Sequence, residues 1–265
     1  TDRRGECVYG GCPHYRRCFI ERAERAGREA DLVIANHALV MINAARGQDG
    51  GRAGQAAVPT RIVFDEGHHL FDAADSTFAA AFTGQETIEL RRWIVGPEAK
   101  ARGRRRGLAA RLSDVVSYDE GGALALEAAV AAAALLPGDG WLQRIAEGLP
   151  LGPVEKLFAQ VRGTVYARAS AQDAGYGLET EMAELDGAIV EAAAPALEAL
   201  EALFRPLTAL GKRLEAVLDD APDWLDGQAR ARIEGAIAGL GWRAQTLSAW
   251  IALVARLGGP ADLLP

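Results

Sequence analysis

Cysteine is nearly absent from this chain, and its distribution is informative. Only three of the 265 residues are cysteines, and the last of them is Cys18. An odd, clustered count argues against a disulfide framework. It favours a metal or cluster site in a reducing compartment, so we expect a cytoplasmic protein. The sequence also lacks any run of about 18 apolar residues, so no membrane span is expected.

Aromatic residues are scarce as well, at 6% of the chain, whereas alanine is abundant. Alanine with scattered Leu, Glu and Arg favours helices. The net charge of −7 does not by itself indicate a protein that binds nucleic acid. The charge is uneven, however, because residues 1–28 hold seven arginines against four carboxylates, a local charge of +3. Such a basic surface could bind phosphate on a protein that is acidic overall.

The three cysteines, Cys7, Cys12 and Cys18, follow the spacing C-x4-C-x5-C, with a Gly-Gly pair and a proline between them. Thiolates this close in sequence can surround one soft metal centre. Three ligands are one fewer than zinc or an iron–sulfur cluster normally takes. His14 could complete a zinc site, a further cysteine could complete a cluster, or the three thiols could be free in a loop.

Two short apolar segments are predicted to be parallel strands. Residues 31–35 read DLVIA, and residues 62–64 read IVF. Continuous apolar runs of this length suit strands that are covered on both faces. Asn36 is placed to cap a helix after the first segment. A strand, a helix and a second strand in this order predict a βαβ unit.

Asp65 and Glu66 follow the second apolar segment, where the strand would end. In an open α/β sheet, ligand chemistry is found at this position. Asp65 could hold Mg²⁺ through water, and Glu66 could polarise an attacking water. The alternative is an ordinary strand end with two solvated acids. The motif Asp65-Glu66-Gly67-His68 alone does not decide between a ligand site and an ordinary strand end.

The cysteine spacing is followed in order by ADLVIANHALVM at residues 30–41 and IVFDEGHHL at residues 62–70. Together these motifs resemble the DinG family of iron–sulfur superfamily 2 DNA helicases, which is related to XPD. The resemblance implies a mainly α chain with a small, incomplete α/β fragment of two parallel strands. It also implies three parts: a partial iron–sulfur cluster domain at 1–30, a fragment of the first, RecA-like helicase motor domain with its DEAH-type box at 31–75, and an all-α Arch-like domain at 76–265.

The same resemblance implies roles in ATP hydrolysis. Asp65 helps to hold Mg²⁺, and Glu66 activates the water that attacks the γ-phosphate of ATP. His68 couples the nucleotide state to DNA contacts. The chain contains no GxxxxGK[ST] phosphate loop. We therefore expect a piece of a longer helicase that does not hydrolyse ATP by itself.

The cysteines match three of the four that hold a [4Fe–4S] cluster in that family, whose members move 5′→3′ along single-stranded DNA. The cluster would shape a small basic domain that helps to separate forked DNA. Arg16 and Arg17, beside the cysteines, are candidates for backbone contacts. The alternative is a non-enzymatic helical module that binds nucleic acid or protein and has a small zinc site, with Cys7, Cys12, Cys18 and His14 as its ligands.

Two features of the helical part can also be predicted. Apolar residues recur three and four positions apart over 178–218 and 224–257, which predicts two long antiparallel helices. Pro195 and Pro206 should kink or restart the first helix. In residues 1–70, two strands without neighbours are barely stable, and their edges invite pairing with another chain. We therefore expect either disorder there or a homodimer formed through those strands.

Overall fold

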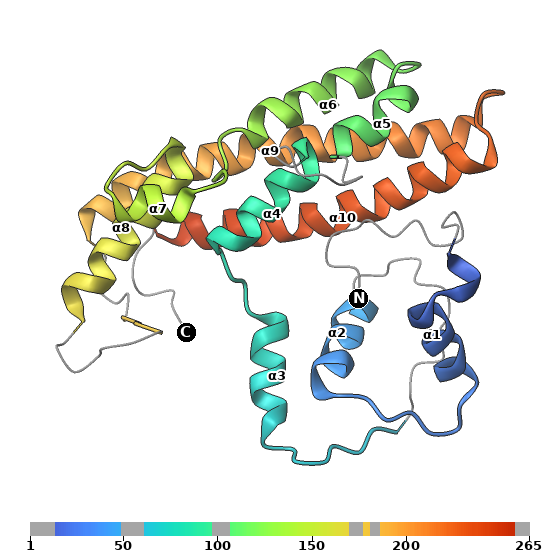
Figure 1. The fold of residues 1–265 in the computed structure, drawn as a ribbon, viewed down its shortest axis with the longest axis horizontal. Coiled ribbons are helices and arrows are strands. Elements are labelled where there is room, and N and C mark those ends of the chain that lie inside the picture. The colour runs from blue at the N-terminus through green and yellow to red at the C-terminus, as the bar shows by residue number, and fades with distance from the viewer. Residues whose placement is uncertain (1–13, 49–60, 97–106, 170–176, 181–185, 258–265) are drawn as a thin grey trace. The chain divides into compact units, whose positions relative to one another are not determined.

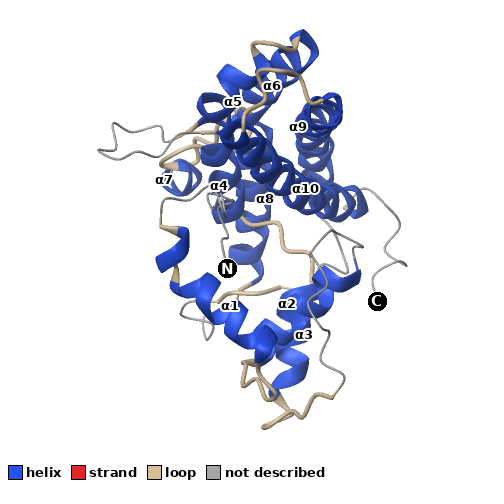
Figure 2. Cartoon of the chain, turned by 90° about the vertical axis from the view of Figure 1, so that its right-hand side faces the viewer, coloured by secondary structure: helices blue, strands red, loops and turns tan. Residues whose placement is uncertain are grey.

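The fold was analysed in a computed structural model (Figure 1). The described residues form two compact units, named here the N-terminal unit, up to Ala81, and the C-terminal unit, from Phe82 onwards. Within them the chain is helical and has no β-strand (Figure 2). No described helix is long and apolar enough to cross a bilayer. The residues that the structure describes are 14–48, 61–96, 107–169, 177–180 and 186–257.

The N-terminal unit is built from short helices. Its elements are the 3₁₀ helix η2 (Tyr15–Arg17), α1 (Phe19–Glu29), α2 (His37–Gln48) and α3 (His69–Phe78). Helices α2 and α3 pack against each other. The side chain of Asn36 accepts a hydrogen bond of 2.8 Å from the amide of Leu39 at the start of α2. The predicted helix cap at Asn36 is therefore confirmed.

The two predicted parallel strands are not formed in the part of the chain that the structure describes, so the prediction of a βαβ unit was wrong there. Residues 32–36 and 61–64 lie outside any helix or ladder. Their apolar side chains are exposed, with Ile34 at 93% and Val63 at 94%. A strand needs a neighbour to pair its amides and carbonyls. The described residues supply no such neighbour, so the two segments remain irregular.

The C-terminal unit is an assembly of helices around one long central helix. Helices α6, α8 and α10 all pack against α9, and Figure 1 shows α10 running alongside it. This arrangement confirms that the chain is mainly α. The elements are α4 (Gly84–Val95), α5 (Leu108–Val116), α6 (Glu120–Ala133), α7 (Trp141–Ala146), α8 (Gly152–Arg168), α9 (Gly187–Asp220) and α10 (Gly227–Arg256).

Helices α9 and α10 are the predicted long antiparallel pair. Leu200, Leu203 and Leu207 on α9 are fully buried, as is Leu247 on α10. Their spacing of three and four residues places them on one face of each helix. Pro195 and Pro206 were predicted to kink or restart the first helix; the restart was wrong, because α9 continues as one helix through both, and the kink stays a prediction. A proline removes one backbone hydrogen bond, and the packing of α9 against three other helices opposes a break there.

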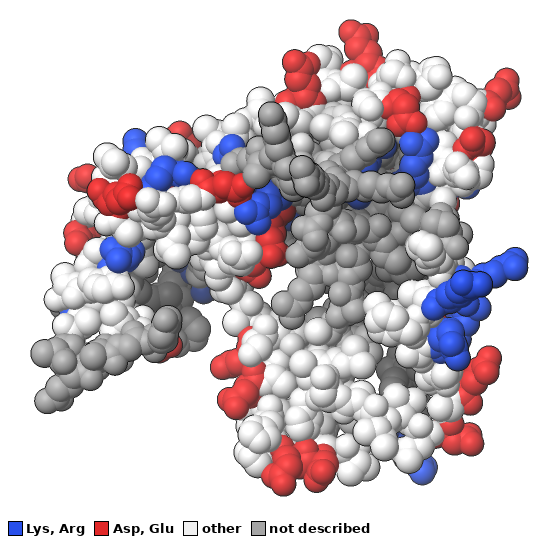
Figure 3. All heavy atoms as spheres, viewed as in Figure 1, with Lys and Arg blue, Asp and Glu red and all other residues white. Residues whose placement is uncertain are grey.

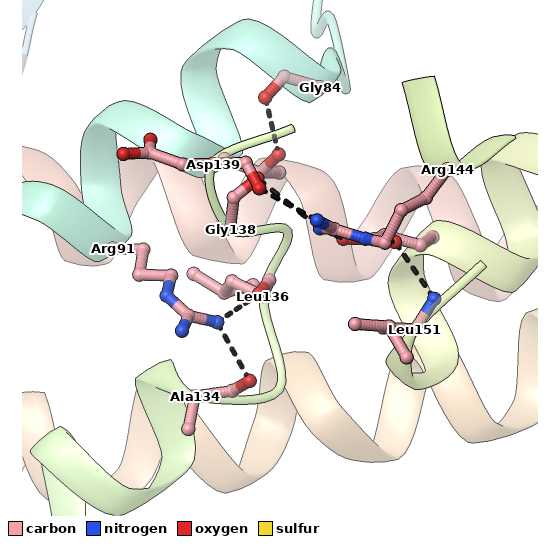
Figure 4. A network of polar contacts seen from close by, with 10 residues as sticks. Gly84, Arg91, Ala134, Leu136, Gly138, Asp139, Arg144 and Leu151 are labelled. Carbon is pink, nitrogen blue, oxygen red and sulfur yellow. Dashed lines mark hydrogen bonds and ion pairs between the residues drawn. The ribbon is translucent and has the colours of Figure 1, made fainter. Parts of the chain in front are cut away.

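A polar network fixes the loops between α6, α7 and α8 (Figure 4). The guanidinium of Arg144 donates to both carboxylate oxygens of Glu155 and to the carbonyl oxygens of Gly138 and Asp139. Glu155 is 1% exposed and also accepts a hydrogen bond of 2.8 Å from the amide of Leu151. The buried charge is therefore paired and hydrogen-bonded, as a buried carboxylate requires.

Candidate functional site

The Asp65-Glu66 pair lies in a turn that leads into α3. The amide of His69 donates to the carbonyl of Glu66 at 3.0 Å, and the amide of Leu70 donates to the carbonyl of Gly67 at 3.1 Å. Glu66 has a backbone φ of 50°, in the left-handed region that residues other than glycine rarely adopt. Both acidic side chains are exposed. The turn therefore exposes two adjacent carboxylates at the surface of the N-terminal unit.

Glu66 and His68, which were predicted to act in the same site, lie close together in the structure. The Nδ1 atom of His68 is 3.4 Å from Oε2 of Glu66. Both side chains are largely exposed, His68 at 67% and Glu66 at 70%. The His68 ring also lies against that of His69, with 4.0 Å between centroids. The turn thus brings together a carboxylate and an imidazole, although water screens an interaction at this exposure.

A second ring contact ties the apolar segment before Asp65 to helix α2. The His37 and Phe64 rings lie 5.8 Å apart between centroids and are tilted by 34°. Both residues are half-buried. His37 is the first residue of α2, and Phe64 immediately precedes Asp65. The sequence alone did not predict this contact, because a single histidine such as His37 is most often an ordinary structural residue. Periodicity gives no signal for two residues in different segments.

The cysteine-rich segment lies only partly within the described residues, because Cys7 and Cys12 fall outside them. Cys18 is half-buried and forms no disulfide, and it stands between η2 and α1. His14 is exposed and immediately precedes η2, and its carbonyl accepts a hydrogen bond of 2.9 Å from the amide of Arg17. Within the described residues, no three His, Cys, Asp or Glu side chains are grouped so that they could hold a metal ion.

Basic side chains gather over the part of the N-terminal unit that α1 occupies (Figure 3). Arg16 and Arg17, the predicted DNA contacts, are both exposed on η2. Beside them, Tyr15 Oη and Arg25 Nε each donate to Oε1 of Glu21 at 2.8 Å. The hydrogen bond from Tyr15 and the one from Arg25 hold the pKa of Glu21 below its ordinary value. This local network orders the surface next to the two exposed arginines.

Comparison with known proteins finds partial similarity to DNA helicases. Over 91 residues the chain is 28% identical to the ATP-dependent DNA helicase YoaA of Escherichia coli (strain K12), covering 34% of this chain and 14% of that protein. Over 92 residues it is 32% identical to the YoaA helicase of Haemophilus influenzae, with the same coverage. Over 78 residues it is 38% identical to the ATP-dependent DNA helicase DinG of E. coli K12, covering 28% of this chain and 10% of that protein.

The similarity is limited in extent. The matched segment spans about a seventh of the YoaA proteins and a tenth of DinG. No family model matches the chain. No solved structure matches it either. About a third of the chain is therefore related to part of ATP-dependent DNA helicases.

Proposed function

We propose that this chain supplies part of the ATP-hydrolysing edge and of the DNA-contacting surface of an ATP-dependent 5′→3′ DNA helicase of the DinG type. The observation that carries the proposal is the partial identity to the DinG and YoaA helicases, in a chain that exposes two adjacent carboxylates and an imidazole at one turn. ATP hydrolysis in such enzymes depends on positioning and charge neutralisation rather than on covalent chemistry.

Each residue of the turn has a separate role in this proposal. The carboxylate of Asp65 binds the water shell of Mg²⁺, since hard oxygen ligands suit this cation. Glu66 orients and activates the water that attacks the γ-phosphate of ATP. His68, 3.4 Å from Glu66, senses the charge at that carboxylate and relays the nucleotide state to the DNA contacts. By itself the chain hydrolyses no ATP, because its sequence contains no phosphate loop.

The basic surface at η2 and α1 contacts DNA in this proposal. The guanidinium groups of Arg16 and Arg17 are exposed and can reach phosphate oxygens on a single strand or at a fork. The affinity of such contacts falls with rising salt concentration, because binding releases counterions from the DNA. It does not depend on the base sequence of the DNA. The Arch-like role belongs to the C-terminal unit, whose long helices hold one packed core.

The carboxylate roles can be tested in the complete gene product with Glu66→Gln. This substitution keeps the size of the side chain and removes its basicity. We expect DNA-stimulated ATP hydrolysis to fall by about 10²-fold or more, the usual contribution of a general base. Asp75→Asn is the matched control, because Asp75 is an exposed carboxylate on the neighbouring helix α3. An unchanged rate in Glu66→Gln would refute the proposal.

The cysteines hold a [4Fe–4S] cluster in the proposed helicase, and the chain offers three of the four thiolates that such a cluster needs. One further thiolate, in addition to Cys7, Cys12 and Cys18, must complete it. A complete cluster predicts a brown protein with visible absorbance and four irons for each chain. Cys18→Ser should abolish both signals in the complete gene product. A colourless protein with one stoichiometric zinc would instead favour the helical binding module with a zinc site.

A further inference from the structure

His37 and Phe64 form an unexpected ring contact in the N-terminal unit. Their centroids are 5.8 Å apart. Both rings are half-buried, whereas no residue of this unit whose burial is described is fully buried. A ring contact between two half-buried residues in such exposed surroundings can anchor the two segments locally. Phe64 is the last residue before the carboxylate pair, so the anchor acts directly on the approach to the turn.

The turn is also held on its other side. Past Glu66, the amides of His69 and Leu70 bond the carbonyls of Glu66 and Gly67. The left-handed φ of Glu66 is strained for a residue with a Cβ atom, so neighbouring contacts must hold it. Asp65 and Glu66 themselves are exposed. Their direction therefore depends on the two flanking anchors rather than on packing of their own side chains.

His37 is connected to the helix that follows the turn through its own helix. It is the first residue of α2, whose first turn is capped by Asn36 at 2.8 Å. Helix α2 packs against α3, which begins immediately after His68, and both helices belong to the N-terminal unit. The two ends of the turn are thus connected to one helix pair, through His37 before it and through α3 after it.

We propose that His37 is a positioning residue for the Asp65-Glu66 carboxylates, acting through its ring contact with Phe64. This inference rests on the proposed function, since it assigns the carboxylates to Mg²⁺ and water. The contact fixes the direction from which the chain enters the left-handed turn. It thereby sets where the two carboxylates point relative to the bound nucleotide.

The test measures DNA-stimulated ATP hydrolysis by the complete gene product. His37→Ala removes the ring and should lower kcat about tenfold, with a smaller change in the KM for ATP, because small misplacements of reacting groups cost this much or more. His37→Phe keeps an aromatic ring against Phe64 and should restore most of the rate. Phe71→Ala is the matched control, since it removes an aromatic ring that is 77% exposed in the same unit.

Three outcomes overturn the inference. The first is an unchanged kcat in His37→Ala when Glu66→Gln abolishes hydrolysis. The second is an equal loss in His37→Ala and His37→Phe, which would assign the effect to the imidazole nitrogens rather than to ring packing. The third is a loss in His37→Ala that appears in KM alone. Activity retained by Glu66→Gln would instead refute the proposed function, so the two failures are distinguishable.

The contact itself can be measured in the 265-residue chain without ATP hydrolysis, which covers the case in which a His37 variant does not fold. The chain has four histidines, so few imidazole proton resonances need assignment in a proton spectrum. Phe64→Leu should shift the ring protons of His37, because the ring current of Phe64 is lost. The ring protons of His14 should stay in place. Unshifted His37 resonances would overturn the inference.

Discussion

The two units contrast most sharply in what their apolar side chains do. In the C-terminal unit Trp250 is 2% exposed and Leu200 is fully buried. In the N-terminal unit Ile34 is 93% and Val63 is 94% exposed. Burying one such side chain contributes roughly 1.5–3 kcal/mol. The C-terminal unit therefore gains this stabilisation many times, whereas the described part of the N-terminal unit gains very little of it.

The contrast shows that a segment can be helical without being stabilised by burial of its apolar side chains. The helices of the N-terminal unit have about three turns or fewer, a length that is marginal for an isolated helix in water. They rely on local interactions, such as the cap at Asn36 and the 2.8 Å contact between Arg25 and Glu21. Helices α9 and α10 instead share a continuous core. The residues proposed for catalysis lie in the unit with the smaller packing contribution.

The largest expected effect comes from core truncation. Trp250→Ala should lower the free energy of unfolding of the C-terminal unit by about 3–5 kcal/mol, because it leaves a large cavity. Ile34→Ala should change the free energy of unfolding of the N-terminal unit by less than about 0.5 kcal/mol, as substitutions at exposed positions do. Urea unfolding followed by circular dichroism measures both. A comparable cost for the two substitutions would break the contrast between the units.

The next effect concerns the buried ion pair. Arg144→Met leaves Glu155 buried without its cation and should cost about 3 kcal/mol of unfolding free energy. Arg92→Met is the matched control, since its pair with Asp139 is exposed and should contribute less than about 1 kcal/mol. Equal small costs for both would show that Glu155 finds other partners.

The pH dependence sharpens this prediction. Burial raises the pKa of Glu155, but the hydrogen bonds from Arg144 and from the Leu151 amide, together with the charge of Arg144, outweigh it and hold the pKa below its ordinary value. The pair therefore stabilises the fold above the unfolded pKa of about 4.3, and this contribution is lost as pH falls through the folded pKa. In Arg144→Met the burial effect prevails and the folded pKa is raised. Stability should then fall as pH rises, and an unchanged sign in acid titration would contradict this.

The smallest effect tests whether another copy covers the N-terminal unit. We expect the chain to self-associate through its exposed apolar segments, and Ile34→Lys with Val63→Lys should weaken association about tenfold or more. Light scattering over a concentration series measures this. Leu149→Lys is the control, since Leu149 is 65% exposed but lies in the C-terminal unit. A chain that stays monomeric at every concentration would exclude self-association.

The long helices could be predicted from the sequence because their cause is periodic. The recurrence of residues such as Leu207, Leu210 and Leu214 every three or four positions is visible in the sequence itself. The cap at Asn36 is similarly local. The polar network of Arg144 with Glu155 could not be foreseen, because it joins a short helix to the next one across a loop. The same holds for His37 and Phe64.

The strand prediction failed for a different reason. The residues at 32–34 and 62–64 have the composition of covered strands, but composition does not supply a neighbour. Strand formation is a property of a pair, whereas helix formation closes hydrogen bonds within one segment. The candidate site shows the same division. The type and order of Asp65, Glu66 and His68 could be read from the sequence, but the left-handed backbone at Glu66 could not.

The φ of 50° at Glu66 has a consequence for saturation mutagenesis. Substitutions at this position are expected to differ in two measured properties, the amount of folded protein and the rate of ATP hydrolysis. Glycine and asparagine tolerate the conformation, so they should give abundant protein without turnover. Valine and isoleucine resist it and should lose both. A scan that records growth alone would merge these classes. Paired measurements of protein level and ATP hydrolysis would separate the effect of the backbone conformation from the effect of losing the carboxylate.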